Sequence, residues 1–299
     1  RNIISGAGFG VVFSDPNSYQ CAVIGNYIGT DITGTKSIPN HEGVLLWTSG
    51  NHRVGGTRAG EGNLICGNQN GIQLNGYGVS ENILLGNSIG WDANGNPLPN
   101  DTGISINMGQ KHVIVGGYTQ AEGNRICGGT IAMRITDRGI QACYIAGNTI
   151  DNPGGAGFYF ENGSNHNFVQ ANTLTKWRFN AVRVDYGAGN MLRANLHAGS
   201  KPQEIILLME GGNSMLAAPE ATALTPNGFS GKTIPFGRVE TYLYDAAEIR
   251  PLGFTDADAN GAFSCAYPEL SGGKRFVLLV TDAFGSTSPF STVFALPVN

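Results

Sequence analysis

The stretch Ile24-Gly25-Asn26-Tyr27-Ile28-Gly29-Thr30-Asp31 returns 61 residues later as Leu85-Gly86-Asn87-Ser88-Ile89-Gly90-Trp91-Asp92. A looser copy, Ala146-Gly147-Asn148-Thr149-Ile150-Asp151, follows after the same step. The segment Asn2-Ile3-Ile4-Ser5-Gly6 recurs in the same way at residues 63–67 and 124–128. Small residues also come about halfway between the copies, which gives a repeating unit of about 30 residues. A fixed period of this length predicts an architecture in which each unit stacks on the next.

Each unit contains short apolar bursts separated by Gly, Asn, Ser or Asp. The first burst has the form Gly-apolar-x-apolar, as in Gly71-Ile72-Gln73-Leu74 and Gly157-Phe158-Tyr159-Phe160. Alternation with a period of two indicates strands with one buried face. Three short strands per unit predict an all-β fold: a right-handed parallel β-helix of about eight coils over residues 1–217, with helices almost absent.

The repeat spacing predicts which residues become neighbours along the solenoid axis, where equivalent strands lie about 4.8 Å apart. One inward file is expected to hold the apolar residues Ile4, Ile28, Ile65, Ile89, Ile126, Ile150 and Leu174. Asparagines at 26, 87, 148, 172 and 195 form a second column. We expect this column at a sharp corner, because side-chain amides can bond along the stack and tolerate left-handed backbone.

The motif Gly-Asn-x-Ile-Gly-Thr-Asp-x-x-Gly at 25–34, with Val-Gly-Gly at 54–56, resembles the bacterial right-handed parallel β-helix repeat proteins of the pectin-lyase-like superfamily. The resemblance covers about two thirds of the chain and implies the fold. It implies little about activity, because this fold carries many functions. It also implies that a saccharide would lie on the outward side of the first strand of each coil, in a groove bordered by inserted loops.

The pattern changes beyond the repeats. Residues 218–233 are predicted to be a linker or cap, because Ala, Thr and Pro dominate there. Longer alternating segments at 238–244, 261–267, 274–281 and 288–296 predict a small antiparallel β-sandwich over residues 234–299. The stretch 256–263 is similar to immunoglobulin-like modules attached to bacterial surface proteins, which implies presentation or anchoring.

Asp256, Asp258 and Asn260 match the opening of a calcium loop, although position 12 of that loop is Tyr267 instead of Glu. The favoured interpretation is an Asn-Gly hairpin turn, with calcium as the alternative and no other cofactor expected. The five cysteines are expected to be free thiols, because Cys66 and Cys127 lie two coils apart and beyond disulfide reach.

The composition excludes several classes of function. There are 18 Lys and Arg against 22 Asp and Glu, a formal charge of −4, and no basic cluster, which argues against a nucleic-acid partner. No apolar run reaches the roughly 18 residues of a membrane helix, so no membrane span is expected. The two resemblances together imply an extracellular or cell-surface location.

The outward positions of the first strands locate the candidate site. Glu161 and Asp185 lie one coil apart on this face, so their carboxyl groups could approach to about 5 Å, a separation that suits a retaining glycosidase. Arg134 and Arg183 could instead neutralise a uronate, as a lyase requires. The candidate substrate-binding residues are Asn107, Arg134, Asp137, Tyr159, Arg183 and Tyr186, and Trp47, Trp91 and Trp177 could add sugar-stacking platforms. The alternative is a ladder of cross-strand charge pairs, each worth a few tenths of a kcal/mol.

The leading hypothesis is a secreted or cell-surface solenoid with a structural, adhesive or carbohydrate-binding role and a polysaccharide or cell-surface glycan as partner. The alternative is a polysaccharide hydrolase or lyase with Glu161 and Asp185 as catalytic residues. No site motif typical of polygalacturonases or pectate lyases is found on this face. The first coil begins within a repeat, so we also expect end-to-end stacking into homo-oligomers through an uncapped coil edge.

Overall fold

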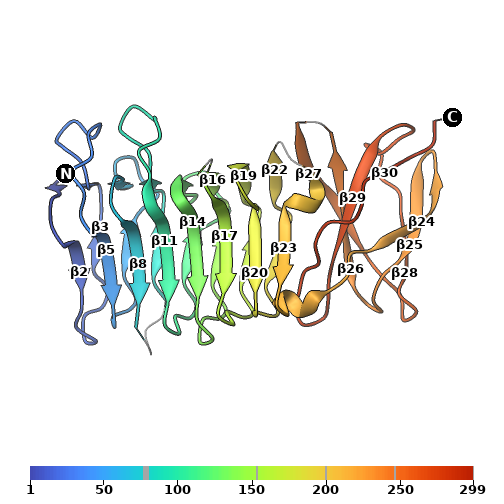
Figure 1. Cartoon of the computed structure of the whole chain (residues 1–299), viewed down its shortest axis with the longest axis horizontal. Coiled ribbons are helices and arrows are strands. Elements are labelled where there is room, and N and C mark those ends of the chain that lie inside the picture. The colour runs from blue at the N-terminus through green and yellow to red at the C-terminus, as the bar shows by residue number, and fades with distance from the viewer. Residues whose placement is uncertain (77–80, 153, 199–200, 246, 299) are drawn as a thin grey trace.

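The computed structural model describes residues 1–76, 81–152, 154–198, 201–245 and 247–298. Within these ranges the only helices are two short 3-10 turns, η1 (Pro202–Glu204) and η2 (Gly212–Met215). The remaining elements are strands, and those of one long sheet stand in a row along the axis of an elongated body (Figure 1). The chain is an all-β solenoid of about seven turns with parallel sheets, one turn fewer than predicted.

Three sheets form the sides of the solenoid. Sheet 1 contains β2 (Phe9–Phe13), β5 (Glu42–Trp47), β8 (Asn70–Asn75), β11 (Asn100–Asn107), β14 (Gly128–Thr136), β17 (Ala156–Glu161), β20 (Val182–Asp185) and β23 (Ile206–Met209). Sheet 2 contains β3 (Ala22–Val23), β6 (Arg53–Gly55), β9 (Ile83–Leu85), β12 (Ile114–Gly116), β15 (Tyr144–Ala146), β18 (Phe168–Gln170) and β21 (Met191–Arg193). Sheet 3 contains β1 (Ile3–Ile4), β4 (Tyr27–Ile28), β7 (Leu64–Ile65), β10 (Ser88–Ile89), β13 (Arg125–Ile126), β16 (Thr149–Asn152), β19 (Thr173–Trp177) and β22 (Leu196–Ala198) before it continues into the C-terminal part.

The predicted inward file is confirmed in sheet 3. Strand register pairs each member of the file, from Ile4 to Leu174, with the next. Ile28, Ile89 and Ile150 are fully buried in the solenoid core. The first steps along the file alternate between 24 and 37 residues, so the mean period of about 30 residues conceals a short turn followed by a long one.

Asparagine side chains form a continuous ladder at the corner between sheets 2 and 3. Asn87 Nδ2 donates to Asn124 Oδ1 at 2.9 Å, and Asn124 Nδ2 donates to Asn148 Oδ1 at 2.9 Å. Such contacts link Asn2, Asn26, Asn63, Asn87, Asn124, Asn148, Asn172 and Asn195. The ladder satisfies polar groups that would otherwise be buried without partners.

The glycines of the repeat motif are required by close contact between turns. Gly29 has φ +92° and Gly90 has φ +77°. A Cβ at Gly29 would collide with the carbonyl oxygen of Cys66 in the next turn, and one at Gly90 with that of Cys127. All five cysteines are free, as expected, and burial raises the pKa of the Cys66 thiol to about 12.

The C-terminal strands continue sheet 3 of the solenoid, at the end far from the N-terminus (Figure 1). β27 (Glu248–Asp256) pairs antiparallel with β22, and β26 (Arg238–Tyr244), β29 (Arg275–Thr281) and β30 (Phe294–Ala295) follow. Val277 and Leu279 pack on the solenoid core, whereas Leu278 and Val280 pack in a second core with Phe229. This antiparallel sheet therefore closes the end of the solenoid core.

A three-stranded antiparallel sheet, sheet 4, covers the other face of the closing sheet. It consists of β24 (Glu220–Thr225), β25 (Gly228–Lys232) and β28 (Ala262–Cys265). Residues 218–233, expected as a linker or cap, thus hold a hairpin, and β30 is much shorter than the predicted strand at 288–296. The two layers show part of the predicted sandwich. Within the described ranges, no helix is both long enough and apolar enough to cross a membrane.

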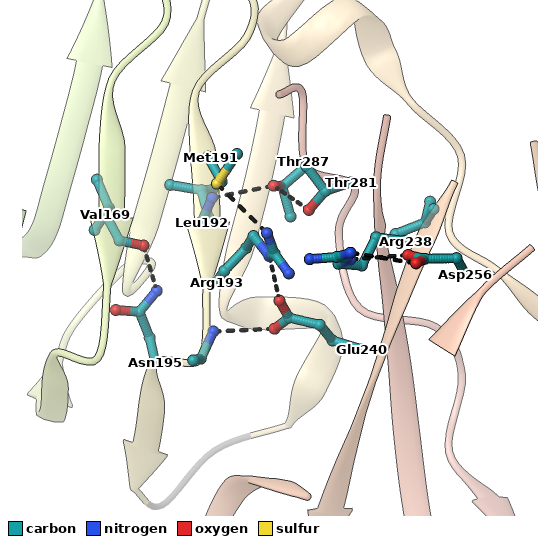
Figure 2. Close-up of polar contacts among 12 residues, drawn as sticks. Val169, Met191, Leu192, Arg193, Asn195, Arg238, Glu240, Asp256, Thr281 and Thr287 are labelled. Carbon is teal, nitrogen blue, oxygen red and sulfur yellow. Dashed lines mark hydrogen bonds and ion pairs between the residues drawn. The ribbon is translucent and has the colours of Figure 1, made fainter. Parts of the chain in front are cut away.

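A buried ion pair fixes the junction between the solenoid and the closing sheet (Figure 2). Arg193 Nε donates to Glu240 Oε1 at 2.5 Å, while Tyr242 Oη and the Ala194 amide donate to Oε2 at 2.7 and 3.0 Å. Glu240 is only 5% exposed. A buried carboxylate is tolerated when a counter-charge and further donors surround it, as they do here.

Candidate functional site

Side chains that point outward form two rows along the axis on the outer face of sheet 1, as the period-two alternation of the first strands predicts. Ser105 pairs with Arg134, Arg134 with Tyr159, and Tyr159 with Arg183. Phe158 is fully buried, so its neighbour Tyr159 projects outward. The second row runs through Asn107, Thr136 and Glu161. The sequence reasoning overlooked β5, which adds Leu45 and Trp47 to the two rows.

Glu161 and Asp185, the two acids considered for catalysis, are each bound by an arginine. Arg134 Nε contacts Glu161 Oε1. Arg183 binds Asp185 with two nitrogens, Nε to Oδ1 at 3.1 Å and Nη2 to Oδ2 at 2.7 Å. Both acids are nearly buried, with Glu161 9% and Asp185 5% exposed. Of the cross-strand charge ladder considered from the sequence, the structure shows the Arg134–Glu161 pair, whereas Arg183 and Asp185 pair within the single strand β20.

Tyr159 contacts both members of the Arg183–Asp185 ion pair. Its hydroxyl donates to Asp185 Oδ2 at 2.9 Å, and the Arg183 guanidinium lies over its ring at 4.9 Å from the centroid. Burial, together with the hydrogen bond to the neighbouring carboxylate, raises the pKa of Tyr159 to about 12. Hydrogen bonding to Asp185 also raises the pKa of Arg183. Tyr159 is therefore a neutral hydrogen-bond donor at ordinary pH.

An open groove of about 470 Å³ lies beside these pairs, over β8, β11 and β14. Among the residues that line it are Gln73, Asn75, Ser105, Asn107, Arg134 and Asp137. It thus contains three of the predicted binding residues, Asn107, Arg134 and Asp137. Tyr186 lines a neighbouring hollow of about 620 Å³ with Arg138 and Asn165, while Glu161, Asp185, Tyr159 and Arg183 are absent from the described lining of both.

Amide and hydroxyl groups dominate the groove. Ser105 Oγ donates to Asn107 Oδ1 at 3.0 Å. Asn75 Oδ1 is buried and has no hydrogen-bond partner in the described part of the chain. Gln73, Asn75 and Ser105 were not among the site residues predicted from the sequence. Gln73 and Ser105 pair in register on neighbouring strands, about 4.8 Å apart along the axis, and Asn75 follows Gln73 on the same face of β8, so this group of polar outward positions was the signal that could have marked them.

The three tryptophans differ in position. Trp47 is 49% exposed and lies beside Asn75 in the register of sheet 1. Trp91 is buried under the Arg125 guanidinium, 3.6 Å from the ring centroid. Trp177 is half-buried and packs edge-on against His197. Only Trp47 among these three therefore offers an exposed ring near the groove.

The candidate calcium residues make contacts within the protein. Asp256 pairs with Arg238, with Nε and Oδ1 2.8 Å apart (Figure 2). Asp258 Oδ1 accepts from the backbone amides of Asn260 and Ala262 at 2.8 and 2.9 Å, which is the hydrogen bonding of a tight turn. The described residues hold no cluster of three or more His, Cys, Asp or Glu suited to a metal. Calcium binding at this turn stays a prediction.

No family model and no curated protein matches the chain. Among solved structures, it is similar to full-length tailspike protein 2 from Escherichia coli O157:H7 bacteriophage CAB120, with 11% identity, a TM-score of 0.39, and coverage of 97% of this chain and 50% of that one. It is also similar to the enzymatically active domain of bacteriophage CBA120 tailspike protein 2, with 10% identity, a TM-score of 0.33, and coverage of 98% and 56%. The chain spans about half the length of these proteins. Membership of the pectin-lyase-like superfamily stays a prediction.

Proposed function

We propose that this chain is a carbohydrate-binding β-solenoid, and that an extended polysaccharide lies in the sheet 1 groove over β8, β11 and β14. The observation that carries the proposal is the row of amide and hydroxyl side chains held in register along the groove floor. Parallel strands fix these groups at equal spacing, which suits a polymer of repeated hydroxyl-bearing units.

Individual groups in the groove support this assignment. Asn75 Oδ1 is a buried acceptor without a partner in the described chain, so a ligand hydroxyl that reaches it would satisfy it. Asn107 keeps its amide nitrogen for a ligand, because the contact with Ser105 uses its oxygen. Trp47 stands exposed beside Asn75 and offers the flat apolar surface on which a sugar ring can stack.

Glu161 and Asp185 support binding better than catalysis. A retaining glycosidase needs one carboxyl group that carries a proton and another that is free to attack the sugar. Here each carboxylate is already bound by an arginine, Glu161 by Arg134 and Asp185 by Arg183, and Asp185 also accepts a hydrogen bond from the Tyr159 hydroxyl. We therefore assign both acids to holding Arg134 and Arg183 in place, with a hydrolase or lyase as the alternative.

The proposal extends to the setting of the molecule. We infer an extracellular or cell-surface location, with the C-terminal part, predicted to be an immunoglobulin-like module, acting as cap or anchor. End-to-end stacking of copies would use the outer edges of β1, β2 and β3, each the last strand of its sheet in the described chain. Light scattering over a range of concentrations tests the stacking, and a constant monomer mass would count against it.

Affinity electrophoresis of the full chain through gels that contain neutral or acidic polysaccharides tests the binding proposal. We expect retardation by at least one polymer, with affinity at least tenfold weaker in Gln73→Ala and Asn107→Ala. Asn17→Ala, an exposed asparagine that lines neither groove nor hollow of sheet 1, is the matched control. Unchanged affinity in both groove variants would refute the assignment. Release of reducing ends by the wild type, abolished in Glu161→Gln, would establish the enzyme instead.

A further inference from the structure

A second groove, of about 570 Å³, lies on a different side of the solenoid, on the outer face of sheet 3. Its floor is formed by the outward residues of four consecutive strands, Tyr27, Leu64, Ser88 and Arg125. These residues are paired in register across β4, β7, β10 and β13. Leu64 and Arg125, like Tyr27 and Ser88, occupy the same position in successive 61-residue repeats.

One wall of this groove is built from two copies of the same loop. Residues 56–60 and 62 line it, and residues 120, 121 and 123 of the next repeat continue it. A glutamate braces each copy from within. Glu61 Oε2 accepts from the Arg58 amide at 3.2 Å, and Glu122 Oε2 accepts from the Thr119 amide at 2.8 Å. The wall is therefore ordered, and its surface consists largely of small residues and backbone.

The opposite wall is formed by the loop that holds Asp92, Ala93 and Gly95. Asp92 Oδ1 accepts from the backbone amides of Asn94 and Asn96 at 2.9 and 2.7 Å. The Ala93 amide donates to the Gly34 carbonyl at 2.9 Å, so this loop rests on its copy from the preceding repeat. The Asp92 carboxylate is thus hydrogen-bonded within its own loop.

Two arginines give the groove a net positive charge. Arg58 and Arg125 both line it and are both exposed, and neither forms an ion pair with the carboxylates described in the structure. The Arg125 guanidinium lies over the buried ring of Trp91, with Cζ 3.6 Å from the ring centroid. This contact restricts the side chain before any ligand arrives and leaves its edge nitrogens available.

We propose that this groove is a second binding site, which takes an anionic polysaccharide whose uronate carboxylates are neutralised by Arg58 and Arg125. A guanidinium fork matches the geometry of a carboxylate. The two-turn repeat places equivalent backbone groups of the wall about 10 Å apart along the axis, which suits a linear polymer. Arg58 and Arg125 occupy different positions of the repeat, because Thr119 and Leu64 stand at the equivalent sites. The walls offer small residues and backbone in place of the large aromatic anchors typical of protein interfaces.

Binding of three uronate polymers to the full chain, oligogalacturonate, oligomannuronate and hyaluronan, tests the site by calorimetry. We expect at least one to bind, and Arg58→Gln with Arg125→Gln to weaken that binding at least tenfold. Lys232→Gln with Lys274→Gln removes the same charge from exposed positions of the C-terminal part and should leave the affinity unchanged. For oligogalacturonate, complete methyl esterification should weaken binding by the wild type.

Further outcomes separate this site from the sheet 1 groove. Asn107→Ala should leave the arginine-dependent binding intact, because it lies on another face. The inference is overturned if no uronate polymer binds, if the arginine and lysine variants weaken binding equally, or if the arginine variant binds as tightly as the wild type. Far-ultraviolet circular dichroism of each variant shows whether a loss of affinity comes from misfolding, and single substitutions at each arginine then replace the double variant.

Discussion

Replacement of Asn124 by Ala removes one rung of the asparagine ladder. The Asn124 side chain accepts from the amide and Nδ2 of Asn87 at 3.0 and 2.9 Å, and it donates to the Leu84 carbonyl and to Asn148 Oδ1, both at 2.9 Å. In the variant, Asn148 Oδ1 keeps its contact with the Asn124 backbone amide. The Asn87 amide, one of the two Asn87 Nδ2 hydrogens and the Leu84 carbonyl lose this partner, while the other Nδ2 hydrogen keeps its contact with the Val54 carbonyl at 2.9 Å. This region is buried.

The expected loss of stability follows from these three groups. Each buried polar group left without a partner costs roughly 1–3 kcal/mol. A water molecule that enters the vacated space would recover part of this, because the site is polar. We therefore expect Asn124→Ala to lower the free energy of unfolding by about 3–5 kcal/mol. This loss is large for a single substitution.

Urea unfolding followed by far-ultraviolet circular dichroism measures this loss. Solenoids can unfold in parts, so hydrogen exchange of the Asn87 amide provides a local measurement. Asn17→Ala, at an exposed asparagine of a surface turn, should change stability by less than about 0.5 kcal/mol. A loss below about 1 kcal/mol in Asn124→Ala, with unchanged exchange at Asn87, would refute the reasoning that the ladder holds adjacent turns together.

Three further predictions concern charged and titratable groups. Glu240→Gln leaves Arg193 without its buried counter-charge and should lower stability by about 3 kcal/mol in calorimetric melting, whereas an unchanged melting temperature would contradict the role given to the ion pair. Burial lowers the pKa of His197 from 6.5 to about 3. This shift contributes at most about 5 kcal/mol to the free energy of unfolding, which is fully present above pH 6.5 and is lost as the pH falls toward 3. In His197→Leu, the urea midpoint of unfolding should fall less between pH 6.5 and pH 3 than it does in the wild type. The pKa of Tyr159 is raised from 10.0 to about 12. The difference between the absorbance titrations of the wild type and Tyr159→Phe at 295 nm should therefore show no tyrosinate below pH 10. The stability that this shift contributes is present below pH 10 and is lost between pH 10 and 12.

The inward file was predictable because burial acts on the same position in every turn. Ile28, Ile89 and Ile150 differ little in type, and their spacing alone places them in register. The ladder was only partly predictable, because an even spacing of about 30 residues matches only some of its members. Asn63 and Asn124 follow the alternation of long and short turns instead, and they became visible only with the strand register.

The candidate site shows where periodicity stops being informative. Register placed Arg134 and Tyr159 in the correct row, because a strand alternates its faces. It could not tell that Glu161 would turn to Arg134, or that Tyr159 would donate to Asp185, since those contacts depend on side-chain rotamers. Trp91 was a candidate platform, yet it is covered by Arg125, a residue 34 positions away in the chain.

The junction of β22 and β27 has a mechanical consequence. The hydrogen bonds between adjacent turns of the solenoid point along its long axis. Tension applied to the two ends of the molecule therefore acts on every interface between turns with the same force. Most adjacent turns are joined by strand pairing in three sheets, which divide this force among them. In the described chain, the strand pairing at the seam with the closing sheet is limited to His197 with Ile249 and Ala198 with Glu248. Side chains reinforce it, among them Arg193 with Glu240 and the Thr287 hydroxyl, which accepts from the Leu192 amide. Stretching the molecule should therefore separate the closing sheet from the solenoid before any two adjacent turns of the solenoid come apart.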